Sequence, residues 1–162
     1  MSDPTPGPAV VVRADDVETL ANRSVGLHLL ADSSATGHAL SSLRVELHGG
    51  ADGAVPHRHD RSSELFYVLD GTAQLLAGED VITAVRGELI VVPPGLPHAF
   101  AAPAGADAEL LIIITPGVER FEYFRQLGRI ASGQQPPESL LEVQDRYDTY
   151  FLDSPSWRSA RA

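Results

Sequence analysis

The sequence predicts an all-β fold, an antiparallel sandwich or barrel, with helices added at its carboxyl end. Between residues 41 and 115, short apolar or alternating segments are separated by turn signals about every ten residues, a spacing typical of antiparallel β folds. After Thr115-Pro116-Gly117 the apolar residues recur at near-helical spacing instead. The 162 residues are the common length of one domain, so we expect a single core.

The expected strands are β-rich segments between turns of Gly, Pro and Asp. Residues 43–48 alternate strictly between apolar and polar side chains, which gives this strand one buried and one exposed face. The pair Asp70-Gly71 is a strong hairpin signal between residues 64–69 and residues 72–77. The remaining expected strands are residues 81–85, 88–92, 98–101 and 109–115.

The two ends of the chain are expected to differ from the barrel, which we place at residues 10–115. Three prolines in residues 1–9 predict an extended, disordered lead-in. Residues 116–162 are expected to be a helical extension of the same domain. A first helix is indicated by Val118, Phe121, Phe124, Leu127 and Ile130. A second amphipathic helix, with Pro137 near its start, is indicated by Leu140, Leu141, Tyr147, Tyr150 and Phe151, and residues 155–162 are expected to be a tail.

The composition narrows the chemistry that the chain can perform. Cysteine is absent, which excludes disulfides, thiolate nucleophiles and every cysteine-based metal site. Lysine is also absent, and all 12 basic residues are arginine, so a lysine Schiff base is excluded as well. A metal would have to be held by imidazole and carboxylate groups, which suit iron, manganese, cobalt, nickel, copper or zinc.

Charge and hydropathy also exclude several kinds of partner. The formal net charge of −10 argues against nucleic acid or an anionic membrane as the main partner. No apolar run approaches the ~20 residues that cross a bilayer, and residues 1–8 have neither the basic nor the apolar region of a secretory signal. We therefore expect a cytoplasmic protein with no membrane partner.

Three of the six histidines lie in two short segments bounded by Gly and Pro. In a strand, His57 and His59 project from the same face because the side-chain period is two. Glu64 begins the next expected strand after a short loop and can face the same interior. His98 follows the rigid turn at residues 93–97. Two histidines and a carboxylate form a facial set, and a third histidine completes a four-ligand site with open positions.

These segments resemble the two motifs of the cupin superfamily. The first motif matches at His57-Arg58-His59, then after four residues Glu64, and after six more Gly71. The second matches at Gly87, then Pro93-Pro94-Gly95 and His98. The sequence departs from the pattern twice, with Ala51 in place of the leading Gly and Ala102 in place of the closing Asn. The resemblance covers residues 41–115 and implies a jelly-roll β-barrel that binds a divalent metal through His57, His59, Glu64 and His98.

The resemblance also implies an activity. Single-domain cupins with these motifs and a helical tail resemble quercetin 2,3-dioxygenases, which suggests a dioxygenase acting with O₂ on a flavonol-like or other polyhydroxylated, enolisable aromatic substrate. Glu64 would then be catalytic as well as a ligand, taking a proton from a substrate hydroxyl. A non-redox cyclase or isomerase acting on a polyketide-like substrate is the alternative, with the metal as Lewis acid. A non-catalytic cupin that binds a small molecule is a third.

The surroundings of the expected site follow from strand alternation. Phe66 and Phe100 each lie two residues after a metal ligand and should face the same interior, as packing residues and as the apolar wall of a substrate pocket. Arg58, between two inward histidines, should point outward. His28, His38 and His48 lie outside the motifs and are expected to be surface or sheet residues. The resemblance further implies a homodimer.

Overall fold

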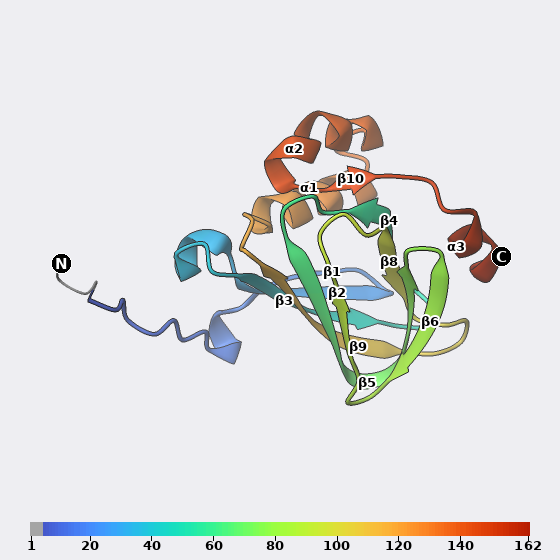
Figure 1. Ribbon diagram of the computed structural model, residues 1–162, viewed down its shortest axis with the longest axis horizontal. Helices are drawn as coiled ribbons and strands as arrows, with labels where there is room; N and C mark the ends of the chain where they lie inside the picture. The colour runs from blue at the N-terminus through green and yellow to red at the C-terminus, as the bar shows by residue number, and fades with distance from the viewer. Residues whose placement is uncertain (1–4) are drawn as a thin grey trace.

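Antiparallel strands curl into a barrel in the computed structural model, which describes residues 5–162 (Figure 1). The strands are β1 (Glu18–Ala21), β2 (Val25–Ala31), β3 (Ser41–Leu47), β4 (Asp52–Arg58), β5 (Ser63–Ala77), β6 (Asp80–Val85), β7 (Leu89–Val92), β8 (His98–Ala101), β9 (Ala108–Thr115) and β10 (Tyr150–Phe151). Neighbouring strands follow the order β1-β2-β3-β9-β5-β8-β4-β10, and β6 and β7 also pair with β5. The prediction of an antiparallel all-β fold is confirmed.

The core fills the inside of the curled sheet because the inward strand positions are apolar. Along β9, buried and partly buried residues alternate over its whole length, as they do along β3. The buried members include Leu43, Val45, Leu110 and Ile112. The opposite face of β3 is polar, so the alternation seen in the sequence decides which face meets the core.

Strand β5 is a single strand of 15 residues, so the predicted hairpin at Asp70-Gly71 is wrong. Its first half pairs with β7 and β9, and its second half pairs with β6 and β8. Gly71 has φ +71°, and the register against β9 shifts between Val68 and Asp70. The glycine therefore bends β5 at the point where its pairing changes from β7 and β9 to β6 and β8. The chain reverses direction only after Ala77.

The sequence interpretation also missed β1 and β2. No residue of β1 is buried, so this strand has no apolar periodicity to reveal it. It pairs along its length with β2, from Glu18 opposite Leu29 to Ala21 opposite Gly26. Residues 1–4 of the expected disordered lead-in lie outside the described residues, and residues 5–13 are neither helix nor strand.

The first part of the carboxyl-terminal extension covers one end of the barrel, and its last residues lie against the side of the barrel (Figure 1). Its helices are α1 (Phe121–Ala131), α2 (Gln144–Tyr147) and α3 (Pro155–Ala160), and a 3₁₀ segment spans Pro137–Val143; shorter 3₁₀ turns lie at Ala14–Asp16 and Ser33–Thr36. Helix α1 was predicted. Among residues 5–162, no helix has both the length and the apolar character needed to cross a membrane.

Two predictions about the extension are wrong. The expected second amphipathic helix ends at Tyr147, because Asp148 takes a left-handed conformation with φ +48°. Tyr150 and Phe151 then pair with β4 as strand β10. The expected tail contains helix α3, which is capped by Ser154 and holds the buried Trp157.

Candidate metal centre

The two sequence motifs meet inside the barrel. His57 lies in β4, His59 just after it, Glu64 in β5 and His98 at the start of β8. β4 and β8 are paired, with His57 directly opposite His98. The four side chains are at most 5% exposed, and one ligand atom from each lies within 4.8 Å of all the others. The strand pairing therefore assembles three imidazoles and one carboxylate in a buried cluster.

The orientation of the imidazoles is set by backbone carbonyl groups. His57 Nδ1 is 2.8 Å from the carbonyl oxygen of Val55, and His98 Nδ1 is 2.9 Å from that of Leu96. His59 Nδ1 is 2.6 Å from the carbonyl oxygen of Asp148. Because a carbonyl only accepts, each Nδ1 carries the hydrogen and donates it. Each Nε2 is then an acceptor with its lone pair facing the cluster.

The donor set fits a divalent metal ion. Glu64 Oε2 lies 2.6 Å from His98 Nε2, 3.0 Å from His59 Nε2 and 3.9 Å from His57 Nε2. Ligands at about 2.1 Å from one ion are roughly 3 Å apart, so these separations suit a shared cation. Lone pairs of imidazole and carboxylate that face each other repel unless a proton or a metal ion lies between them. The second hydrogen bond of each histidine is the kind of support that metal-binding imidazoles have.

The electrostatics favour the protonation states that a metal needs at Glu64 and His57. Burial, together with the nearby imidazoles of His98 and His59, holds the pKa of His57 well below its usual value. Burial opposes ionisation of Glu64, but His59 and His98 outweigh it, and the pKa of Glu64 lies well below its usual value. Burial lowers the pKa of His98, yet the hydrogen bond and charge of Glu64 raise it overall. An ionised carboxylate thus faces a neutral His57.

The structure places the two predicted pocket residues in the core beside the cluster. Phe66 is fully buried and Phe100 is 7% exposed. The Phe66 ring centroid lies 6.2 Å from that of His98 and 5.4 Å from that of Phe100. The two rings therefore form an apolar wall next to the metal ligands, as well as packing the barrel.

The histidines outside the motifs take no part in the cluster. His28 and His48 lie beside carboxylates, at 3.3 Å from Glu46 and 3.6 Å from Asp107. His38 Nδ1 lies 2.8 Å from the hydroxyl of Ser33. Arg58 is partly exposed and stacks over the ring of Tyr150 while it donates to Asp60. Its side chain does not enter the cluster.

Sequence reasoning missed the residues that the extension brings to the cluster. Asp148 is fully buried, and its carboxylate accepts hydrogen bonds from the backbone N–H groups of Asp60 and Arg61. Arg120 and Tyr123, at the start of α1, are also buried. No motif or periodicity links these positions to residues 57–64. The sequence therefore carries no signal that the extension packs against residues 59–61.

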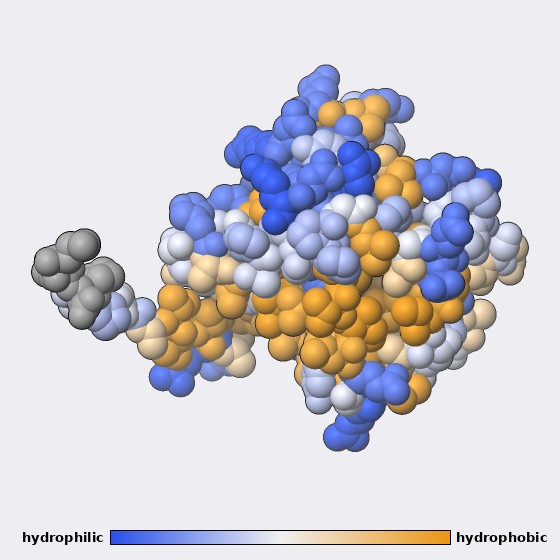
Figure 2. All heavy atoms as spheres, viewed as in Figure 1, coloured by the Kyte–Doolittle hydropathy of each residue, from blue (hydrophilic) through white to orange (hydrophobic). Residues whose placement is uncertain are grey.

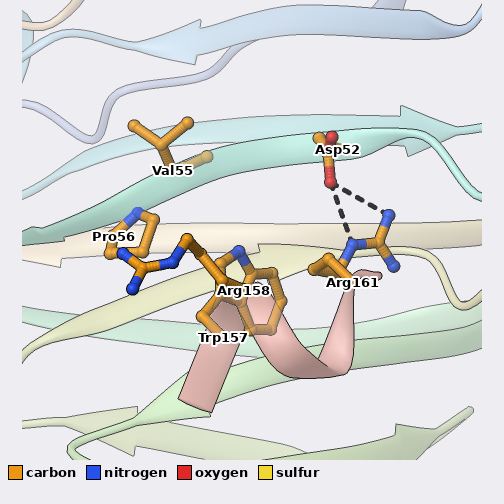
Figure 3. Close-up of a pocket in the computed structure, with 7 residues that line it drawn as sticks. Asp52, Val55, Pro56, Trp157, Arg158 and Arg161 are labelled. Carbon is orange, nitrogen blue, oxygen red and sulfur yellow. Dashed lines mark hydrogen bonds and ion pairs between the residues drawn. The ribbon is translucent and has the colours of Figure 1, made fainter. Parts of the chain in front are cut away.

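Two surface grooves lie away from the cluster. The first, of about 410 Å³, is formed by β4 and α3, where Trp157, Arg158 and Arg161 face Val55 and Pro56 (Figure 3). The second, of about 330 Å³, lies around Gly50, Pro103 and Arg161. Neither groove contains a residue of the cluster.

The match to a known family coincides with the barrel. Residues 43–114 match the family described as Cupin domain, and these residues contain both motifs and all four members of the cluster. Residues 43–114 are thus similar to a cupin domain. An uncharacterized protein of Streptomyces coelicolor is 29% identical over 68 residues, which are 42% of this chain and 61% of that protein. The matched segment is therefore less than two thirds of the length of this curated relative.

Solved cupin structures share the fold at low sequence identity. Streptomyces Pac13, a nucleoside dehydratase, has a TM-score of 0.54 at 17% identity, over 67% of this chain and 83% of that one. The polyketide cyclase RemF of Streptomyces resistomycificus has 0.55 at 22%, over 67% and 80%. An RmlC-like cupin of Shewanella frigidimarina has 0.56 at 20%, over 68% and 92%. At these identities the likeness establishes the cupin barrel.

Proposed function

We propose that this chain is a divalent-metal-dependent enzyme acting on an enolisable, oxygenated small molecule, and in its finer form a dioxygenase of a flavonol-like substrate. The observation that carries the proposal is the convergence of three Nε2 atoms on the carboxylate of Glu64, inside a cupin barrel. Imidazole and carboxylate ligands suit iron, nickel, manganese, cobalt, copper or zinc.

Different residues of the site would bind the metal, move the proton and exclude water. His57, His59 and His98 would hold the ion, which when bound supplies a Lewis acid and, for a redox-active metal, a centre for reaction with O₂. Glu64 keeps its charge in a buried site and is placed to take a proton from a substrate hydroxyl or α-carbon. Phe66 and Phe100 keep water from one side of the cluster. The protein thus orients the substrate and moves the proton.

A redox-neutral reaction is the second candidate. RemF is a polyketide cyclase and Pac13 a nucleoside dehydratase, and both share the barrel of this chain. Cyclisation and dehydration use a polarised oxygen and a carboxylate base without O₂, and the same four residues can provide both. This support is an analogy of fold.

Oxygen consumption separates the two candidates. The purified protein is analysed for bound metal and loaded in turn with iron, nickel, cobalt, manganese, copper and zinc. It is then assayed with a flavonol panel in air and under argon. Oxygen uptake coupled to flavonol loss supports the dioxygenase, and turnover under argon supports the redox-neutral reaction. A protein that binds the panel without converting it in either atmosphere is no flavonol dioxygenase, and the finer form of the proposal is then wrong.

The variant Glu64→Gln tests the carboxylate, with Glu46→Gln as the matched control. Glu46 is a partly exposed carboxylate on the outer face of β3, where it accepts from Arg44. We expect Glu64→Gln to lose about 10²–10⁴-fold in turnover, the usual contribution of a general base, while it keeps much of its metal. Glu46→Gln should match the wild type. Unchanged turnover in Glu64→Gln would refute the catalytic role.

A further inference from the structure

Arg120 has an incomplete set of partners although it is buried. Arg120 is the residue just before α1, and it is only 5% exposed. Nη1 donates to the carbonyl oxygen of Tyr147 and to the hydroxyl of Thr149, which uses both of its hydrogens. Nε is fully buried and has no hydrogen-bond partner, and Nη2 donates to no residue of 5–162. One whole edge of the guanidinium group is therefore left free.

The charge of Arg120 also lacks a counter-ion. Arg120 takes part in none of the ion pairs among residues 5–162. The nearby carboxylate of Asp32 accepts from the backbone N–H of Arg120 instead. The rings of Tyr123 and Phe124 lie 4.4 and 5.3 Å from the guanidinium carbon, and such contacts offset only part of the cost of burying a charge.

Arg120 lies near the candidate metal cluster, because one short segment contacts both. Residues 147–149 join the two: Asp148 accepts from His59, while Tyr147 and Thr149 accept from Arg120. From the other side, Ser62, two residues before Glu64, donates to the carbonyl oxygen of Pro116, four residues before Arg120. The segment that leads to Arg120 is therefore bonded to the segment that leads to Glu64.

The electrostatic effects agree with this placement. The pKa of Tyr123 is raised mainly by burial, while Arg120 lowers it and Glu64 raises it. The charges of Arg120 and Glu64 thus act on the same phenol, which lies at the same end of the barrel.

We propose that the Nε/Nη2 edge of Arg120 binds a carboxylate of the substrate, so that the substrate of the metal centre is a small enolisable organic acid. The N–H groups on this edge are parallel and match the two oxygens of a carboxylate. A bound carboxylate satisfies the orphaned Nε and neutralises the buried charge in one step. The remaining oxygens of the same molecule can then reach the cluster. This inference rests on the broader proposed function, a metal-dependent enzyme acting on an enolisable, oxygenated small molecule, and it names an organic acid in place of a flavonol, which has no carboxylate.

A matched pair of ligands tests the inference by binding alone. The probes are phenylpyruvate, which carries a carboxylate beside an enolisable carbonyl, and its neutral amide. Their affinities for the metal-loaded protein are measured by calorimetry or ligand-observed NMR. We expect the wild type to prefer the acid at least tenfold, because the amide leaves the charge of Arg120 without a counter-ion. A wild type that binds acid and amide equally, or binds neither, overturns the inference.

Two variants separate a binding role of Arg120 from a purely structural one. Arg120→Lys keeps the charge but loses the paired donors, and we expect the preference for the acid to fall at least tenfold with metal content unchanged. Thr149→Val removes one partner of Nη1 and leaves the free edge intact. It should lower the unfolding temperature but keep the preference. The opposite pattern, with the preference retained in Arg120→Lys and lost in Thr149→Val, shows that Arg120 serves only to hold residues 147–149 in place.

The outcomes for this inference and for the proposed function are distinguishable. Acid-selective binding that depends on Arg120, without turnover of any acid under air or argon, supports the inference while the enzyme proposal fails. Equal turnover of acid and amide that is insensitive to Arg120→Lys refutes the inference while the enzyme proposal stands. Arg125→Lys, at a partly exposed arginine paired with Glu18, is the control for loss of a guanidinium group elsewhere on α1.

Discussion

His59 donates from Nδ1 to the backbone carbonyl oxygen of Asp148 at 2.6 Å, across 89 residues of sequence. The carboxylate of Asp148 is bonded in turn to the backbone N–H groups of Asp60 and Arg61, at 2.9 and 3.0 Å. One residue of the carboxyl-terminal extension thus holds both an imidazole of the cluster and the loop that follows it. The barrel supplies the ligands of the cluster, and the extension orients one of them.

We expect Asp148→Ala to weaken metal binding by about 10–100-fold, the usual effect of removing support from a metal ligand. The two backbone N–H groups lose their charged acceptor, and the free energy of unfolding should fall by about 2–4 kcal/mol. Asp148→Asn keeps one acceptor oxygen and tolerates the left-handed conformation with φ +48°, so its losses should be smaller. Metal titration and urea unfolding measure the two effects. Equal affinities of wild type and Asp148→Ala would show that the carboxylate of Asp148 does not help to orient His59.

Metal binding itself should stabilise the fold. The apo protein buries three imidazoles and a carboxylate at close range, and a metal that binds only the native state adds about 2.7 kcal/mol at 100 times its dissociation constant. For a chain of this length we expect the unfolding temperature to rise by about 5–10 °C on metal addition and to fall again with a chelator. His57→Ala should abolish the shift, whereas His48→Ala, at an exposed position on the outside, should retain it. A full shift in His57→Ala contradicts the ligand assignment.

The cluster could be predicted from the sequence because its members lie in local motifs. Strand alternation places His57 and His59 on one face, and short turns deliver Glu64 and His98 to neighbouring strands. The contacts of Arg120 could not be predicted in the same way. They depend on how the extension packs on the barrel mouth, and no spacing within the sequence encodes that packing.

The fold could be predicted at the level of strands but not of every turn. The apolar alternation of β3 and β9 reports directly which face is buried. Asp70-Gly71 reads as a hairpin because the pair also forms tight turns, yet pairing with β9 up to Gly71 and with β6 and β8 after it keeps the strand continuous. Tyr150 and Phe151 continue a helical pattern, but the free edge of β4 captures them as a strand. Tertiary contacts override the local signal in both places.

Gly71 should be intolerant of a side chain. Its φ is +71°, and a Cβ at this position would lie 2.1 Å from the carbonyl oxygen of Asp107, which accepts from Thr72. We expect Gly71→Ala to lower the free energy of unfolding by more than about 3 kcal/mol, from backbone strain and overlap together. Gly87 has φ +90° but open space around it. Gly87→Ala should lose only the strain, about 1–2 kcal/mol. Similar losses in the two variants, measured by urea unfolding, would contradict this account of the bend.

Trp157 anchors α3 to the barrel. It is 6% exposed and packs with the buried side chains of Leu76, Ala99 and Ala101. Trp157→Ala should therefore destabilise the protein by about 3–5 kcal/mol, as for other large buried aromatic residues. Leu141→Ala, at a position 58% exposed, should change stability by less than about 0.5 kcal/mol. Chemical unfolding compares the two variants, and a Trp157→Ala protein as stable as the control would mean that residues 155–162 are a loose tail.

An apolar face on the outside of the barrel bears on the expected homodimer. Tyr67 pairs with Leu89, and Leu65 pairs with Val91, so these side chains share the outer face of β5 and β7. Tyr67, Leu89 and Val91 are 40%, 57% and 55% exposed. Apolar side chains gather over this part of the molecule in Figure 2. Exposed apolar patches of this kind are typical of protein–protein contacts.

We expect a second copy of the chain to cover this face, with Leu89 and Val91 buried at the centre of the contact. The double variant Leu89→Glu/Val91→Glu places two charges there, and burying unpaired charges strongly opposes association. Light scattering after size exclusion should give the mass of two chains for the wild type and of one chain for the double variant. Val55→Glu, at an equally exposed valine on β4, should remain a dimer. A wild type with the mass of one chain at every concentration shows that this face has no self-partner.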